Sequence, residues 1–125
     1  MAIRNYRDLK VWQRGVGLVA QCYRITALFP RTECYGLVSQ IRRAAVSIPS
    51  NIAEGNGRDH LGDYLRHLSF ASGSLKELET QLWIANRLDF IDEPRLDEVL
   101  VGTAEVGRML SGLKRSLRRR RTQPT

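Results

Sequence analysis

The sequence has few of the residues that hold metal ions or carry out catalysis. Its 125 residues include only two cysteines and two histidines. Cys22 and Cys34 are not at metal-ligand spacing, and we expect both to be free thiols in a reducing cytosol. His60 and His67 have no matching set of cysteines or carboxylates, so the sequence predicts no metal site and no cofactor.

Long apolar runs are also missing. No stretch approaches 18 uninterrupted apolar residues, and the first residues, MAIRNYRDLK, do not contain the apolar core of a signal peptide. We therefore expect a cytoplasmic protein that is neither exported nor inserted in a membrane.

The sequence holds no pattern typical of an enzyme. Ser47 and Ser50 have no histidine or lysine nearby in the sequence that could act as a base. The glycines of residues 55–57 are typical of a helix end rather than of a phosphate-binding loop. We therefore expect a protein that is not an enzyme and has no small-molecule substrate.

Strand-like alternation is absent as well, and apolar residues instead recur at spacings of three and four, which predicts α-helices. The second helix is expected to begin at Glu33 or Tyr35, while Asp59 and Asp92 are the expected N-caps of the third and fourth. The expected helices cover residues 6–28, 33–57, 59–87 and 92–121.

Helices of this length joined by short loops specify an all-α, up-down-up-down antiparallel four-helix bundle. A chain of this length can bury the core of one domain without disulfide or metal support. We therefore expect a single domain over residues 1–125, in which residues 114–125 form a basic C-terminal tail.

Apolar rows in three helices are predicted to face the core. In the first helix the expected core row is Leu9, Trp12, Val16, Val19 and Tyr23, and a second row lies beside it: Val11, Leu18, Cys22, Ile25 and Phe29. The row of the third helix is Tyr64, Leu68, Ala71, Leu75, Leu78, Leu82 and Ala85. That of the fourth is Leu96, Val99, Thr103, Val106, Leu110, Leu113 and Leu117. Gly15 and Gly17 weaken the first helix, which predicts close helix contacts there.

The stretch of residues 40–57, QIRRAAVSIPSNIAEGNG, is apolar around most of a helix circumference. Pro49 is expected to kink this helix, because a proline removes one backbone donor. The remaining polar residues form a narrow stripe, here called the polar arc: Arg43, Ser47, Ser50, Asn51 and Glu54. Two interpretations stay open, a core helix with a structural kink and a functional groove lined by the polar arc.

The same stretch carries a family resemblance. The run QIRRAAVSIPSNIAEG resembles the signature of small four-helix bundle proteins first noticed as open reading frames in intervening sequences of bacterial 23S ribosomal RNA genes. YRDLKVWQRGVGLV at residues 6–19 and GSLKELETQL at residues 73–82 are similar to that family too. The resemblance implies the bundle fold but no settled activity. A more distant relative of this fold is the accessory variability protein that serves a reverse transcriptase in diversity-generating retroelements.

Self-association is expected from residues outside the predicted core rows. The narrow polar arc leaves the second helix apolar on most sides, and three apolar residues of the third helix lie away from its row: Phe70, Ile84 and Leu88. These residues and the polar arc are therefore the predicted subunit interface. The sequence gives no number of subunits, whereas the resemblance implies a closed pentamer.

Charge is unevenly distributed along the chain. Residues 1–32 hold six basic residues and one acid, residues 33–113 hold eight basic residues and twelve acids, and residues 114–125 hold six basic residues and no acid. In an antiparallel bundle, the start of the first helix and the end of the fourth lie at the same end. The cations predicted to meet there form what we call the basic end: Arg4, Arg7, Lys10, Arg14, Lys114, Arg115, Arg118, Arg119, Arg120 and Arg121.

Two functions remain after these exclusions. The first is an adaptor whose partner is RNA or a protein that processes nucleic acid. In this function the basic end contacts phosphate backbones without sequence preference. The second is a structural or protein-interaction module with no nucleic-acid role, whose basic tail aids solubility or complements the negative end of the last helix.

Overall fold

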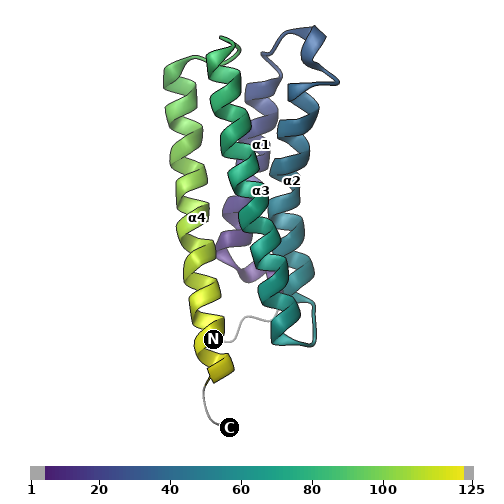
Figure 1. Ribbon diagram of the computed structural model, residues 1–125, viewed down its shortest axis with the longest axis vertical. Helices are drawn as coiled ribbons and strands as arrows, with labels where there is room; N and C mark the ends of the chain where they lie inside the picture. The colour runs from purple at the N-terminus through teal and green to yellow at the C-terminus, as the bar shows by residue number, and fades with distance from the viewer. Residues whose placement is uncertain (1–4, 123–125) are drawn as a thin grey trace.

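The computed structural model describes residues 5–122, with side chains up to Arg120, and contains four long helices (Figure 1). Their bounds are Lys10–Thr26 for α1, Leu37–Asn56 for α2, Leu61–Arg87 for α3 and Glu93–Thr122 for α4. Two short 3₁₀ turns, Tyr6–Asp8 and Arg31–Glu33, precede α1 and α2. Successive helices run in opposite directions, so the structure confirms the antiparallel four-helix bundle.

The predicted starts of the first two helices are wrong, because a separate 3₁₀ turn forms before each of them. Asn5 Oδ1 accepts a hydrogen bond from the Arg7 backbone N–H at 2.8 Å and caps the first 3₁₀ turn. Leu9 then takes an extended conformation, so α1 begins at Lys10 rather than near residue 6. The second 3₁₀ turn similarly delays α2 to Leu37, whose N–H donates to Glu33 Oε1 at 3.1 Å.

The remaining helix ends give mixed outcomes. Asp92 is confirmed as the cap of α4, since its Oδ1 accepts from the Arg95 N–H at 2.9 Å. Asp59 is not the cap of α3, which starts after His60 without a side-chain cap. Gly57 ends α2 as expected, but its backbone is right-handed rather than in the left-handed conformation common for glycine at a helix end. Among the described residues, only Asp89 has a positive φ.

The core row predicted for α1 is confirmed only in part: Leu9 is buried and Trp12 and Val19 pack against the core, but the neighbouring row is more completely buried. Val16 and Tyr23 are exposed, whereas Val11, Leu18 and Cys22 are buried. The buried row includes Gly15, whose missing side chain lets α1 approach Pro49 of α2; a Cβ there would lie 3.5 Å from Pro49 Cβ. Glycine has no apolar side chain, so a search for apolar periodicity does not identify Gly15 as a core position. The periodicity therefore favoured the less buried of the two adjacent rows.

The rows of the other helices are confirmed. In α3 every predicted residue is buried except the half-buried Tyr64, and in α4 every one except the half-buried Leu113. The predicted apolar face of α2 is buried as well, and the helix continues through Pro49, itself buried. Cys22 lies in this core, where burial raises the pKa of its thiol to about 12, while Cys34 is exposed.

Gly55 marks the closest contact between α2 and α3. A Cβ at this position would lie 2.8 Å from His67 Cβ and 3.1 Å from Tyr64 Cδ1. Both neighbours are held close to the α3 backbone, so they cannot move aside easily. By contrast, a Cβ at Gly17 or Gly73 would meet nothing within 4 Å, and close contact therefore explains Gly55 but not Gly17.

We predict opposite effects for two glycine substitutions. Gly55→Ala should lower the free energy of unfolding by roughly 1–2 kcal/mol, because the added methyl overpacks the α2–α3 contact. Gly73→Ala should raise it by up to about 1 kcal/mol, because alanine favours the helix and space is open. Urea denaturation of both variants measures the difference, and an unchanged stability for Gly55→Ala would contradict the close contact.

Candidate nucleic-acid interface

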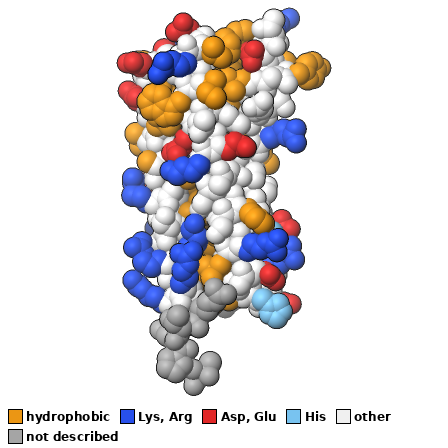
Figure 2. All heavy atoms as spheres, viewed as in Figure 1, with side chains coloured by type: hydrophobic (Ala, Val, Ile, Leu, Met, Phe, Trp, Pro, Cys, Tyr) orange, Lys and Arg blue, Asp and Glu red, His pale blue; other side chains and the backbone are white. Residues whose placement is uncertain are grey.

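α1 begins and α4 ends at the same end of the bundle (Figure 1), where several cations of the predicted basic end lie. Arg7 and Lys10 are exposed beside the start of α1, and Arg115, Arg118 and Arg120 are exposed on the last turns of α4. Figure 2 shows Lys and Arg side chains gathering toward this end, over α3 and α4. Arg4 and the side chain of Arg121 lie outside the described residues.

A hollow of about 630 Å³ opens at this same end. Its lining joins the start of α1 to the end of α4, since both Leu9 and Leu117 contribute. Arg58 and His60, from the connection between α2 and α3, lie on it as well. Sequence reasoning missed these two residues, although the second connection of an antiparallel bundle necessarily lies at the same end as the two termini.

Arg14 differs from the other predicted cations. Its Nη1 pairs with Glu105 Oε1 at 2.8 Å, which joins α1 to α4. Part of its charge is therefore compensated within the chain. The structure gives Arg14 a role between helices that the sequence did not indicate.

Lys114 lies in a groove between α3 and α4. It is half-buried, and its Nζ donates to Ser72 Oγ of α3 at 2.8 Å. Burial, and then the neighbouring charge of Arg118, lowers the pKa of Lys114. Within residues 5–120 no carboxylate forms an ion pair with it.

The polar arc separates into two parts in the structure. Ser47 and Asn51 are half-buried against α3: the hydroxyls of Ser47 and Ser74 lie 2.8 Å apart, and Asn51 Oδ1 lies 3.2 Å from His67 Nδ1. Asn51 Nδ2 also donates to the Ser47 carbonyl at 2.9 Å. This half of the arc is a polar joint between two helices.

The other half of the arc, Arg43, Ser50 and Glu54, is exposed in the single chain. Glu54 pairs with Arg58 at 3.0 Å rather than with Arg43, and its side chain remains 55% exposed. The narrowness of the polar arc predicts that Arg43 and Glu54 are partly desolvated, but within one chain both are exposed. The arc does not line one continuous groove.

Phe70, Ile84 and Leu88 are exposed outside the α3 row. They do not form one patch, because the 14 residues from Phe70 to Ile84 correspond to about 21 Å of helix. Phe70 instead lies beside His67 and under Arg66, with 5.4 Å from the Arg66 guanidinium carbon to its ring centre. Sequence reasoning missed other exposed apolar residues, among them Trp83 and Val101.

Neither a metal cluster nor a membrane span is found in the described part of the chain. No three His, Cys, Asp or Glu residues there are grouped so that they could hold a metal ion. None of the helices described is both long and apolar enough to cross a membrane.

Comparison with known proteins gives one family and a solved relative. The family model described as 23S rRNA-intervening sequence protein matches residues 7–112. A crystal structure of a protein with unknown function from the S23 ribosomal protein family, from Bacteroides thetaiotaomicron VPI-5482, is similar at a TM-score of 0.75 and 19% identity, covering 83% of this chain and 97% of that one. At this identity the likeness shows the fold alone. No curated protein matches the chain.

The polar joint generates a prediction about stability. Asn51→Ala should lower the free energy of unfolding by roughly 1–2 kcal/mol, because it leaves the half-buried His67 Nδ1 without its partner and removes the Asn51 contacts of Ser47. Ser50→Ala, one residue away but exposed, should change it by less than about 0.5 kcal/mol. Thermal or urea unfolding measures both, and equal effects would mean that the joint does not couple α2 to α3.

Proposed function

The chain belongs to the 23S rRNA-intervening sequence protein family, and from this premise we propose that it is a non-catalytic adaptor that binds RNA through its basic end. The observation that carries the proposal is the convergence of cations from three separate segments on one end of the bundle. Arg7 precedes α1, Arg58 follows α2 and Arg120 belongs to the end of α4. The family description refers to an intervening sequence of 23S rRNA, which makes RNA the first nucleic acid to test.

The charge balance at this end favours a polyanionic ligand. Asp8, Glu54, Asp59 and Asp63 are acids near it, and Glu54 is already paired with Arg58. The last twelve residues of the chain contain no acid at all. Such a surface gains affinity for a phosphate backbone mainly by releasing condensed counterions, a mechanism that gives strong salt dependence and little sequence preference.

The second candidate function is a structural or protein-interaction module. Exposed apolar side chains favour it, above all Trp83, Ile84, Leu88 and Val101. Self-association is part of both candidates, and we propose a closed ring, for which the family resemblance favours five subunits. The unpaired thiols support a cytoplasmic location, where such thiols stay reduced.

A truncation is a poor test of the adaptor, because Leu117 of the tail is buried at 2% exposure. Charge substitutions avoid this problem. Replacing Arg115, Arg118, Arg119 and Arg120 by glutamine should weaken RNA binding and make its salt dependence shallower by roughly 0.7 for each lost phosphate contact. Fluorescence anisotropy with a labelled single-stranded RNA between about 50 and 200 mM salt measures both quantities.

The matched control removes four cations from the opposite end of the bundle. Arg24 lies in the last turn of α1 and Arg31 in the 3₁₀ turn before α2, while Arg87 ends α3 and Arg95 lies in the first turn of α4. This control should retain most of the RNA affinity. Equal losses in both variants would show a response to net charge alone, and no loss in either would contradict the adaptor.

Self-association has its own test. Sedimentation of the wild type at micromolar concentration should give a mass several times that of the 14.3 kDa chain. Glu54→Ala should weaken the assembly more than Asp97→Ala, because the polar arc belongs to the predicted interface and Asp97 does not. Within one chain an exposed pair such as Glu54–Arg58 contributes only about 0.5 kcal/mol, so a larger effect would reveal burial by another subunit. A monomer at that concentration would contradict the ring.

A further inference from the structure

A groove lined by polar and basic side chains runs between α3 and α4, next to the basic end. It encloses about 640 Å³, and its polar residues come from both helices. Gly107 of α4 forms part of it, and a Cβ there would lie 3.3 Å from Leu75 Cδ2. Small residues, including Ser72 and Ser111, complete the walls and leave the groove open.

Lys114 lies within this groove with a neutral partner only. Its Nζ donates to Ser72 Oγ, while the ion pairs among described residues do not include it. Partial burial removes some of the water that would otherwise stabilise an ammonium group, and the nearby Arg118 adds repulsion. A bound anion would relieve both effects, since charge-assisted hydrogen bonds to a phosphate strengthen as water is excluded.

Further cations continue along the same wall. Arg108 and Arg115 line the groove, and Arg118 lies one turn beyond Lys114 toward the basic end. From Arg108 to Arg118 the helix rises about 15 Å. A stacked strand rises roughly 3.4 Å per nucleotide along its axis, so this length corresponds to about four nucleotides. Figure 2 shows Lys and Arg side chains along the lower part of this face.

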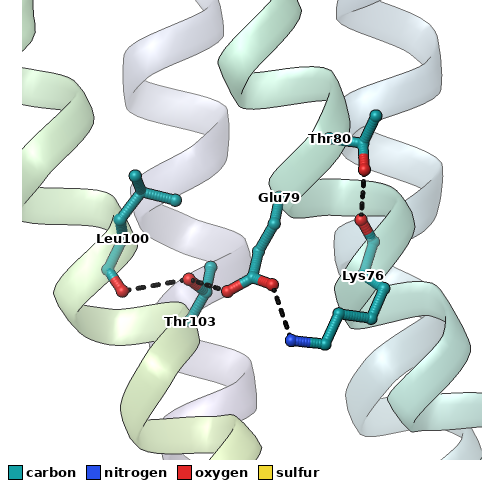
Figure 3. Close-up of polar contacts among 5 residues, drawn as sticks. All are labelled: Lys76, Glu79, Thr80, Leu100 and Thr103. Atoms are coloured by element: carbon teal, nitrogen blue, oxygen red, sulfur yellow. Dashed lines mark hydrogen bonds and ion pairs between the residues drawn. The ribbon is translucent and has the colours of Figure 1, made fainter.

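The carboxylate of Glu79 lies in the part of the groove farther from the basic end, beyond the row of cations that ends at Arg108. Glu79 Oε2 accepts a hydrogen bond from Thr103 Oγ1 at 2.8 Å, and its Oε1 pairs with Lys76 Nζ at 3.2 Å (Figure 3). The same threonine hydroxyl lies 3.0 Å from the Leu100 carbonyl oxygen. The carboxylate is therefore held in place, where it repels a phosphate and occupies Lys76.

We propose that the α3–α4 groove binds the phosphates of single-stranded RNA, entering from the basic end and stopping at Glu79. This inference rests on the proposed function and adds the path and the strandedness of the ligand. Packed helices lie about 8–10 Å apart, so the groove between α3 and α4 suits a single strand better than a duplex. None of the described residues lining the groove is aromatic, so it contacts backbone rather than bases.

The test compares two pairs of charge substitutions that remove the same net charge. Arg108→Gln with Lys114→Gln removes two of the cations that line the groove, and Arg24→Gln with Arg87→Gln is the control at the opposite end. With a labelled single-stranded oligouridylate, the groove pair should lose about tenfold or more in affinity. Its salt dependence should become shallower by about 1.4, for two lost phosphates. Affinity for an RNA duplex of equal length should change little in either pair.

A third variant should improve binding. Glu79→Gln removes the repulsive charge and frees Lys76, while the amide oxygen can still accept from Thr103. We expect tighter binding of the single strand, by several-fold, with an unchanged unfolding midpoint. Weaker binding by a variant that remains folded would overturn the role given to Glu79.

The outcomes separate the groove from the proposed function. If the groove pair behaves like its control while the four tail substitutions abolish binding, the groove proposal is wrong and the adaptor stands. If neither set of substitutions changes RNA binding, both are wrong. If polyglutamate binds the groove and the oligouridylate does not, the ligand is an acidic protein segment, which also overturns the proposal.

Discussion

Close packing of α2 on α3 is the constraint on which the rest of the structure depends. Small residues on α2 make this packing possible. Gly55 has no side chain, which leaves room for His67 of α3, and Ala45 is fully buried in the core. Hydrogen bonds between Asn51 and His67 and between Ser47 and Ser74 then fix the two helices relative to each other. Because α3 packs more extensively on α2 than on α4, the α3–α4 side of the bundle keeps an open groove.

The unequal lengths of the helices determine where charge accumulates. α4 has 30 residues and α1 has 17, which correspond to about 45 and 25 Å. The last turns of α4 extend beyond its neighbours at the end where the termini lie (Figure 1). Arginines on these turns are therefore exposed because too few neighbouring side chains reach them, with Leu117 as the last core contact.

The sequence was sufficient for the fold but not for every face. Heptad rows in α3 and α4 identify their buried sides because a single row of apolar residues exists in each. α1 has two adjacent rows, and the more completely buried one contains Gly15, which carries no hydrophobic signal. Contacts such as Arg14–Glu105 join residues 91 positions apart, and the groove at Gly107 depends on a missing side chain, so neither leaves a local pattern.

The family match covers most of the bundle but not the basic residues at the end of α4. The matched residues, 7–112, include the α2–α3 contact and Arg108, whereas Lys114 and the arginines after it lie beyond the match. Packing that defines the family therefore explains the bundle and the upper part of the groove, but not the cations of the tail. A function common to the family has to work through matched residues, while a function particular to this chain can use the tail. The α3–α4 groove spans that boundary, since Arg108 and Lys114 line it together.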